Sequence, residues 1–152
     1  MLGLNAKLYR NSATYATPTW VEVKDISDLM VSPSWASTKF GTRASRIERG
    51  AKTLSGLTFS GKIKAHLTDV DYVAFRDAHL SPDSVVDFMI LNGAQTANGV
   101  WGYRGEMLVS IQSIDQGLQA KIYDDFELFP ADSDNDFSKA VVAAGSAVFT
   151  AL

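Results

Sequence analysis

The sequence contains no cysteine, so disulfide bonds and thiolate metal sites are excluded from its 152 residues. Histidine is nearly absent too: His66 and His79 stand 13 residues apart, which is a poor pattern for a metal site. A nucleophilic catalytic triad needs a base beside its nucleophile, and the sequence has no Gly-x-Ser-x-Gly motif. We therefore expect no enzymatic activity, no catalytic or metal-binding residue and no cofactor.

Long hydrophobic segments are also lacking. The most apolar stretch, residues 140–152, is interrupted by Gly145 and Ser146 and is too short to cross a bilayer. The first 15 residues contain no apolar core of signal-peptide length. We expect a soluble protein with no membrane contact, and its length suits one domain with a stable core.

The charges are unevenly distributed along the chain. Residues 1–65 hold ten Lys and Arg against four Asp and Glu, whereas residues 66–152 hold four against thirteen. Such an asymmetry favours contact between the first half of one copy and the second half of another. The alternative is a monomer with two oppositely charged faces.

Alternation of apolar and polar residues, which is typical of half-buried β-strands, dominates the chain. In residues 53–67, the apolar residues Leu57, Phe59, Ile63, Ala65 and Leu67 fall on one face. Pro33 is expected at a sheet edge or bulge, because proline cannot donate a ladder hydrogen bond. Further strands are predicted around residues 4–9, 20–23, 29–35, 84–91, 100–114 and 118–128.

One helix is predicted at about residues 69–80. Thr68 is the predicted cap of its first turn, with Asp71 three residues later in an aspartate variant of the capping box. Strands on both sides of a single helix predict a mainly β fold, an antiparallel β-sandwich or barrel with one flanking α-helix. The apolar stripe of the helix is predicted to be Val70, Val73, Ala74 and Ala78.

Residues 36–52 form the most cationic part of the chain. This region admits three interpretations: a nucleic-acid patch, a solvated loop, or an arm that pairs with the carboxylates of a neighbouring copy. Phe40 is the one aromatic residue near the cations, and the acidic remainder of the chain opposes the steering of DNA, so the arm is favoured. The predicted inter-subunit contacts are Lys39, Arg43, Arg46, Arg49 and Lys52.

Residues 131–152 combine an acidic turn with an apolar C-terminal extension. The aspartates at 132, 134 and 136 resemble the opening of a calcium loop, but Phe137 and Ala143 stand where that loop needs Gly and Glu, which favours a solvated turn. The apolar extension either packs back on its own domain or docks on a neighbouring copy. For docking, the candidate contacts are Val148, Phe149 and Leu152.

A series of segments in a fixed order, from about residue 20 to residue 131, resembles the phage tail tube (major tail) protein family. The resemblance covers most of the chain and rests on the combination of segments, since each alone is unspecific. The segments are 20–28 (WVEVKDISD), 37–43 (STKFGTR), 57–61 (LTFSG), 68–78 (TDVDYVAFRDA), 86–93 (VDFMILNG), 102–106 (GYRGE) and the last strand up to Phe129-Pro130.

The resemblance implies a tail-tube-like β domain at residues 1–130, whose copies form rings, usually of six, that stack into a hollow tube. Residues 36–52 would be the inter-subunit loop that reaches neighbouring rings, whereas residues 131–152 contain no segment that matches the family. The implied location is the virion tail, assembled in the host bacterial cytoplasm. The implied partners are other copies of the chain, tape-measure and tail terminator proteins and, in a contractile tail, a sheath.

A tube that delivers DNA needs a lumen that repels phosphate, so that DNA passes without specific binding. Acidic residues of the last long strands are the candidates for this lining: Asp115, Asp124, Asp125 and Glu127. Two other functions remain open. One is a type VI-like secretion tube subunit, and the other is a monomeric small-ligand β-barrel carrier with an apolar cavity.

Overall fold

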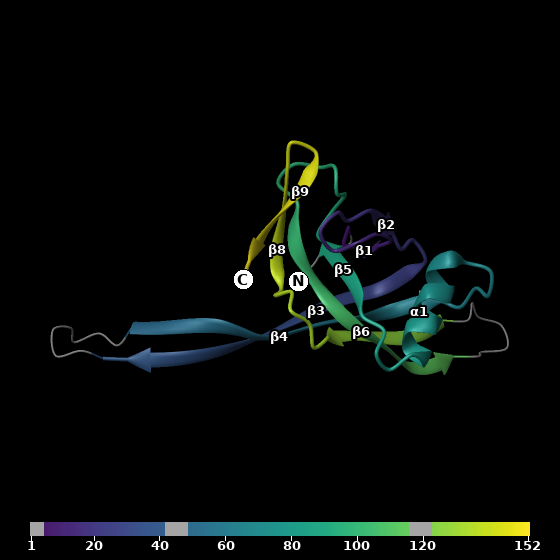
Figure 1. Cartoon of the computed structure of the whole chain (residues 1–152), viewed down its shortest axis with the longest axis horizontal. Helices are drawn as coiled ribbons and strands as arrows, with labels where there is room; N and C mark the ends of the chain where they lie inside the picture. Colours follow the sequence, from purple (N-terminus) through teal and green to yellow (C-terminus); the bar gives the residue numbers. More distant parts are fainter. Residues whose placement is uncertain (1–4, 42–48, 116–122) are drawn as a thin grey trace.

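The computed structural model describes residues 5–41, 49–115 and 123–152. This part of the chain forms nine antiparallel strands and one helix (Figure 1). The mainly β fold with one flanking helix predicted from the sequence is confirmed. The elements are β1 (Lys7–Asn11), β2 (Trp20–Glu22), β3 (Ile26–Phe40), β4 (Arg49–Lys64), α1 (Val70–Leu80), β5 (Val86–Leu91), β6 (Trp101–Asp115), β7 (Tyr123–Pro130), β8 (Ser138–Ala143) and β9 (Ser146–Ala151).

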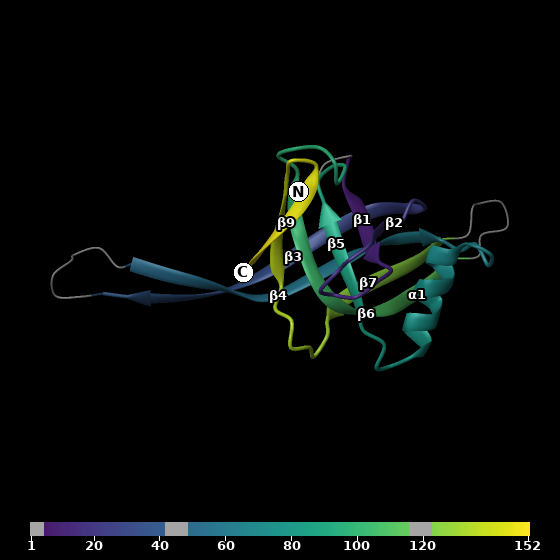
Figure 2. The ribbon, with the colours of Figure 1, turned by 45° about the horizontal axis from the view of Figure 1, so that its top comes forward.

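A single curled sheet joins all the strands, and it divides at β6. Its main path is β2-β1-β5-β6-β7-β4-β3. The beginning of β6, residues 101–104, pairs with β8, and residues 107–115 pair with β7. Because β8 also pairs with β9, the sheet has two arms, one rising with β8 and β9 and one running along β7, β4 and β3 (Figures 1 and 2).

Two glycines allow this division. A Cβ on Gly102 would collide with the carbonyl oxygen of Ile90 in β5, and one on Gly105 would collide with the ring of Phe137. Glycine is therefore required where β6 passes between β5 and the segment that leads into β8. These glycines belong to the 102–106 segment of the family resemblance.

The main hydrophobic core lies between the curled sheet and α1. The ring of Phe75 on α1 packs 5.4 Å from that of Phe88 and 5.1 Å from that of Phe126. Leu57, Phe59 and Ile63 of β4 are each at most 1% exposed, which confirms the core face predicted for that strand. Burial of each large side chain stabilises the fold by about 1.5–3 kcal/mol. Leu67, which was predicted on the same face, is 76% exposed because β4 ends at Lys64.

The position of α1 was predicted correctly, but its cap was not, and of its predicted apolar stripe Ala78 alone is buried. Asp69 caps the helix through hydrogen bonds from the backbone amides of Asp71 and Tyr72, so the predicted cap at Thr68 is wrong. The buried residues are Tyr72, Phe75 and Ala78, whereas Val70 is 74% exposed. The larger aromatic side chains of Tyr72 and Phe75 take the buried face with Ala78, while Val73 and Ala74 are half-buried beside it.

β1 and β5 are buried on both faces. Leu8, Phe88 and Ile90 belong to the main core, while Tyr9, Met89 and other residues form a second cluster with β8. This double burial explains the continuous apolar run of β5, since a strand covered on both sides needs no polar face.

A long hairpin of β3 and β4 extends from the body (Figures 1 and 2). Its register continues to the pair Phe40 and Arg49, so most of the region predicted as the cationic loop 36–52 is a two-stranded hairpin. Pro33 lies in β3, which ends the strand order, as predicted for an edge strand. Residues 32–40 are all exposed, which makes this hairpin a surface available for contact.

Candidate assembly surfaces

A buried ion pair that the sequence analysis missed joins the neighbouring strands β5 and β6. Arg104 donates to Asp87 from Nε at 3.2 Å and from Nη2 at 2.7 Å, and both side chains are about 5–6% exposed. Asn11 also donates to Asp87, at 3.0 Å. Burial raises the pKa of Asp87, while the hydrogen bonds from Arg104 and Asn11 oppose that rise.

Aromatic rings complete the surroundings of Arg104. The guanidinium carbon lies 3.8 Å from the centroid of Tyr15 and 4.5 Å from that of Phe149. Phe149 also packs 6.0 Å from Trp20, and Arg104 Nη2 donates to the Tyr15 carbonyl oxygen at 2.7 Å. These contacts tie β9 and the β1–β2 connection to the centre of the molecule.

Within one chain the C-terminal extension packs back on its own domain through Phe149, and docking on a neighbouring copy stays a prediction. Phe149 packs back on its own chain, whereas Val148 and Leu152 are 54% and 49% exposed and remain available to a neighbour. The hairpin of β8 and β9 is held to β6 by backbone pairing, so these apolar side chains are presented on a fixed strand.

The β3–β4 hairpin carries both cations and aromatic rings. Lys39 and Lys52 are exposed, and the ammonium of Lys52 lies 4.6 Å from the ring centroid of Trp35. Trp35 and Phe40 are 43% and 52% exposed. The predicted contacts Arg43 and Arg46 fall outside the described residues, and Arg49 begins β4 without a described side chain.

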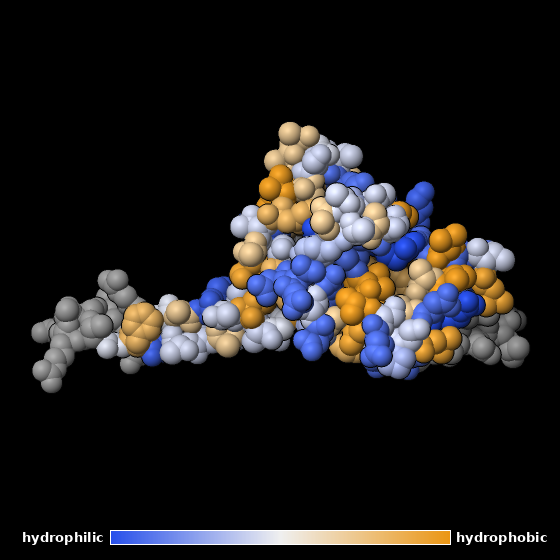
Figure 3. Space-filling view, viewed as in Figure 1, coloured by the Kyte–Doolittle hydropathy of each residue, from blue (hydrophilic) through white to orange (hydrophobic). Residues whose placement is uncertain are grey.

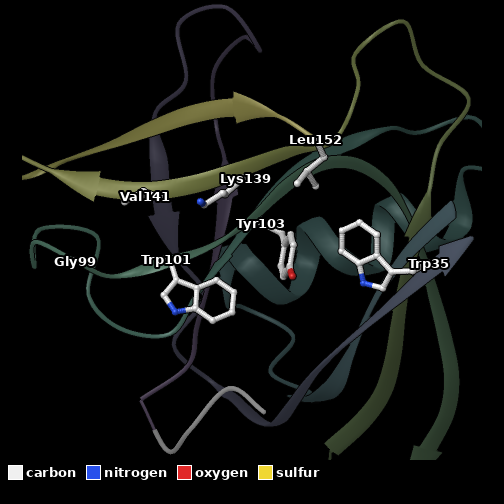
Figure 4. A pocket seen from close by; sticks show the side chains of 7 residues that line it. All are labelled: Trp35, Gly99, Trp101, Tyr103, Lys139, Val141 and Leu152. Carbon is white, nitrogen blue, oxygen red and sulfur yellow. The ribbon is translucent and has the colours of Figure 1, made fainter. Parts of the chain in front are cut away.

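An open groove of about 540 Å³ lies in the angle between the hairpin and the rising arm (Figure 4). Trp35 faces it from β3, and Trp101 and Tyr103 face it from β6, with their rings 6.1 Å apart. Lys139 and Leu152 border it from β8 and the end of the chain. Trp35 is far in the sequence from Trp101 and Tyr103, so no local sequence motif predicts the groove.

The predicted lumen acids separate into two faces of β7. Asp124 is 1% exposed and accepts a 2.8 Å hydrogen bond from the Tyr72 hydroxyl, so the structure places it in the core and it cannot line a lumen in this fold. Asp125 and Glu127 point to the opposite, partly exposed face. Lys62 lies 3.9 Å from Asp125, which partly neutralises that face. Asp115 ends β6, and its side chain is not described.

Both histidines have hydrogen-bond partners. His79 Nδ1 accepts from the Ile111 amide at 3.1 Å, and His66 Nδ1 lies 3.1 Å from the Thr68 hydroxyl oxygen. Among the residues that the structure describes, no group of three or more His, Asp and Glu side chains is arranged to hold a metal ion. The described helix is also too short and too polar to span a membrane.

Apolar side chains gather at two places on the molecular surface, over α1 and along the rising arm of β8 and β9 (Figure 3). At the α1 end, Leu67, Val70 and Leu80 are 69–76% exposed. Leu67 precedes α1, Val70 begins it and Leu80 lies at its end, so both ends of the helix present apolar side chains to solvent.

Comparison with solved structures identifies the architecture. A chain from the tail of an empty GTA particle with C6 symmetry superposes with a TM-score of 0.56, over 95% of this chain and 96% of that one, at 12% sequence identity. This chain has the fold of that tail protein. A chain from the baseplate of the anti-feeding prophage, 6-fold symmetrised, matches with a TM-score of 0.46 over 93% of this chain and 96% of that one, also at 12% identity. No family model and no curated protein matches the sequence.

Proposed function

We propose that this chain is a structural subunit of a phage-like tail, and that copies of it form six-membered rings that stack into a hollow tube. The observation that carries the proposal is the shared fold with a chain of a C6-symmetric tail across 95% of the sequence. The resemblance of the ordered sequence segments to tail tube proteins supports the same function independently.

Ring closure follows from the free edges of the sheet. Within the described part of the chain, β2, β3 and β9 each end a row of strands and pair on one side alone. An unpaired edge is a template for another strand, and head-to-tail pairing of identical subunits closes into a ring when the rotation permits. In this arrangement the subunits complete one another's sheets.

The β3–β4 hairpin reaches a subunit of the adjacent ring. It projects beyond the body and presents Lys39 and Lys52 beside exposed aromatic rings. Asp132, Asp134 and Asp136 are exposed in the turn before β8 and are suitable partners for these cations. Opposite charges at such a contact set its register and suppress incorrect pairings.

Negative-stain microscopy and sedimentation velocity of the purified protein test this function. Rings of six or tubes support it, and a monomer at all concentrations contradicts it. A monomer that binds an apolar ligand would support the carrier instead. The genomic neighbourhood separates a phage tail from a type VI-like secretion tube, because a phage tail requires tape-measure and tail terminator proteins. A sheath gene nearby would indicate a contractile tail.

The face of β7 that carries Asp125 and Glu127 lines the lumen in this proposal. Carboxylates there repel the phosphates of passing DNA, which prevents it from adhering to the wall. We expect Glu127→Lys to slow genome ejection from assembled particles, as measured by the release of a DNA-binding dye signal. Glu127→Gln is the control for loss of charge without reversal. Ejection at the same rate in all three proteins would exclude this lining.

A further inference from the structure

We propose that the groove between the hairpin and the rising arm receives the α1–β5 connection of a second copy of this chain, residues 81–85 together with Leu80 at the end of α1. The inference rests on the proposed head-to-tail self-association and specifies which surfaces meet. It assigns a partner to the aromatic groove and to one of the apolar ends of α1.

The groove lies on the same face of β6 as the main core, at the end of the strand that α1 does not cover. Tyr103 and Met107 of β6 point to the same face of the sheet, and Met107 is fully buried under α1. Further along this face Trp101 is 45% exposed, and Trp35 opposite is 43% exposed. Two tryptophans on one concave surface are a typical centre for a protein contact, because they bury a large area with little loss of side-chain entropy.

The α1–β5 connection has the shape of a compact knob. The Ser84 amide donates to the Ser81 carbonyl oxygen at 3.1 Å, which closes a four-residue turn with Pro82 in its second position. Proline at that position fixes the backbone before binding, so little order is lost on docking. Leu80 and Val85 flank the turn and are 69% and 43% exposed.

Charge favours this knob over the end of the β3–β4 hairpin. Lys139 borders the groove and Lys52 lies over Trp35, so the groove is cationic. Asp83 stands exposed at the tip of the turn. The hairpin end, with the exposed Lys39 beside Phe40, would bring a further cation to the groove and is therefore disfavoured.

The positions of the two surfaces suit an assembly of identical subunits. The β3–β4 hairpin extends from one side of the body and α1 lies at the opposite side (Figure 1), and the groove is lined by Trp35 of the hairpin. Different surfaces on opposite sides produce a heterologous contact that repeats from copy to copy.

A charge exchange tests the contact. We expect Lys139→Glu and Asp83→Lys each to raise the protein concentration needed for assembly by about tenfold or more, since each single change places like charges together. The variant with both substitutions should return toward the wild-type value. Lys24→Glu and Asp25→Lys are matched controls at exposed positions outside the contact, and they should assemble as the wild type does.

The outcomes separate this inference from the proposed function. A wild type that never assembles contradicts the proposed function. A wild type that assembles, with single variants that do so equally well, overturns the contact alone. Single variants that fail without recovery in the double variant also overturn it, provided that circular dichroism shows them folded.

Disulfide trapping gives a second test, because the chain has no cysteine of its own. Val85→Cys combined with Leu152→Cys should give covalent oligomers after oxidation of the assembled protein, seen on a non-reducing gel. Val85→Cys combined with Met30→Cys is the control, since Met30 is 60% exposed on β3 outside the groove. Equal trapping in both proteins, or none in the first, would refute the contact.

Discussion

Arg104 is a residue on which several long-range contacts converge. Its guanidinium joins Asp87 on β5, the backbone of Tyr15 and the ring of Phe149 on β9. A charge at 5% exposure is tolerated because hydrogen bonds and aromatic faces replace the water that it loses. The orientation of the C-terminal hairpin therefore depends on this side chain.

We expect Asp87→Ala to lower the free energy of unfolding by about 3–5 kcal/mol, because the change leaves the buried Arg104 cation without its partner. Replacement of both residues, by Arg104→Met with Asp87→Leu, should cost much less. Urea unfolding followed by tryptophan fluorescence measures both changes. Equal losses in the two proteins would show that packing around the site matters more than the unpaired charge.

The ion pair between Asp87 and Arg104 could not be predicted from the sequence. Asp87 and Arg104 are 17 residues apart, and each lies in a strand whose pattern predicts only apolar burial. Their contact arises from the antiparallel register, in which Arg104 stands opposite Met89, two residues from Asp87. Asp124 was misplaced for a related reason. It lies on the same side of β7 as Phe126 and Leu128, and the hydrogen bond from the Tyr72 hydroxyl makes its burial possible.

The cap of α1 can be identified by comparing the effects of alanine substitutions at Asp69 and Thr68 on stability. We expect Asp69→Ala to lower the free energy of unfolding by about 1 kcal/mol, since two backbone amides lose their acceptor. Thr68→Ala is the matched control. Its hydroxyl contacts His66 at an exposed site, so we expect little change. Thermal unfolding by circular dichroism gives both values, and a larger effect for Thr68 would restore the cap predicted from sequence.

We expect the outer part of the β3–β4 hairpin to be needed for assembly but not for folding. Its outer part contributes exposed residues, while the core begins at Leu54 and Leu57. We expect a variant in which Asn-Gly replaces residues 36–53 to keep the thermal stability of the body but to form no stacked rings. Thermal unfolding and electron microscopy measure the two properties. Tubes of normal length in this variant would contradict the proposed contact between rings.

At the scale of elements, the sequence was most informative where one face of a strand meets the core and the other meets solvent. β4 is such a strand, and its buried residues were predicted correctly. The pattern is less informative where both faces of a strand are covered, as in β1 and β5. It is also less informative in α1, where two different sets of apolar residues could each form the buried face. The aromatic groove could not be predicted, because Trp35 and Trp101 meet only through the curl of the whole sheet.

For the whole molecule, the uneven charge along the chain predicts how assembly responds to salt. The exposed hairpin cations and the acidic residues of the second half attract one another between copies, and this attraction is screened over about 10 Å at 0.1 M salt and about 3 Å at 1 M. We expect the fraction of protein in tubes, measured by sedimentation, to fall as salt rises through this range. An increase with salt would indicate that apolar contacts alone drive assembly.

β6 pairs with β5, β7 and β8, and its side chains reach both hydrophobic clusters through Met107 on one face and Arg104 on the other. Mechanical load applied along the hairpin passes through β4 and β7 into this strand before it reaches the rest of the molecule. Neither arm can melt without releasing hydrogen bonds from the same backbone. The subunit should therefore yield to force in one cooperative step, with the amides in the middle of β6 as the last to exchange with solvent.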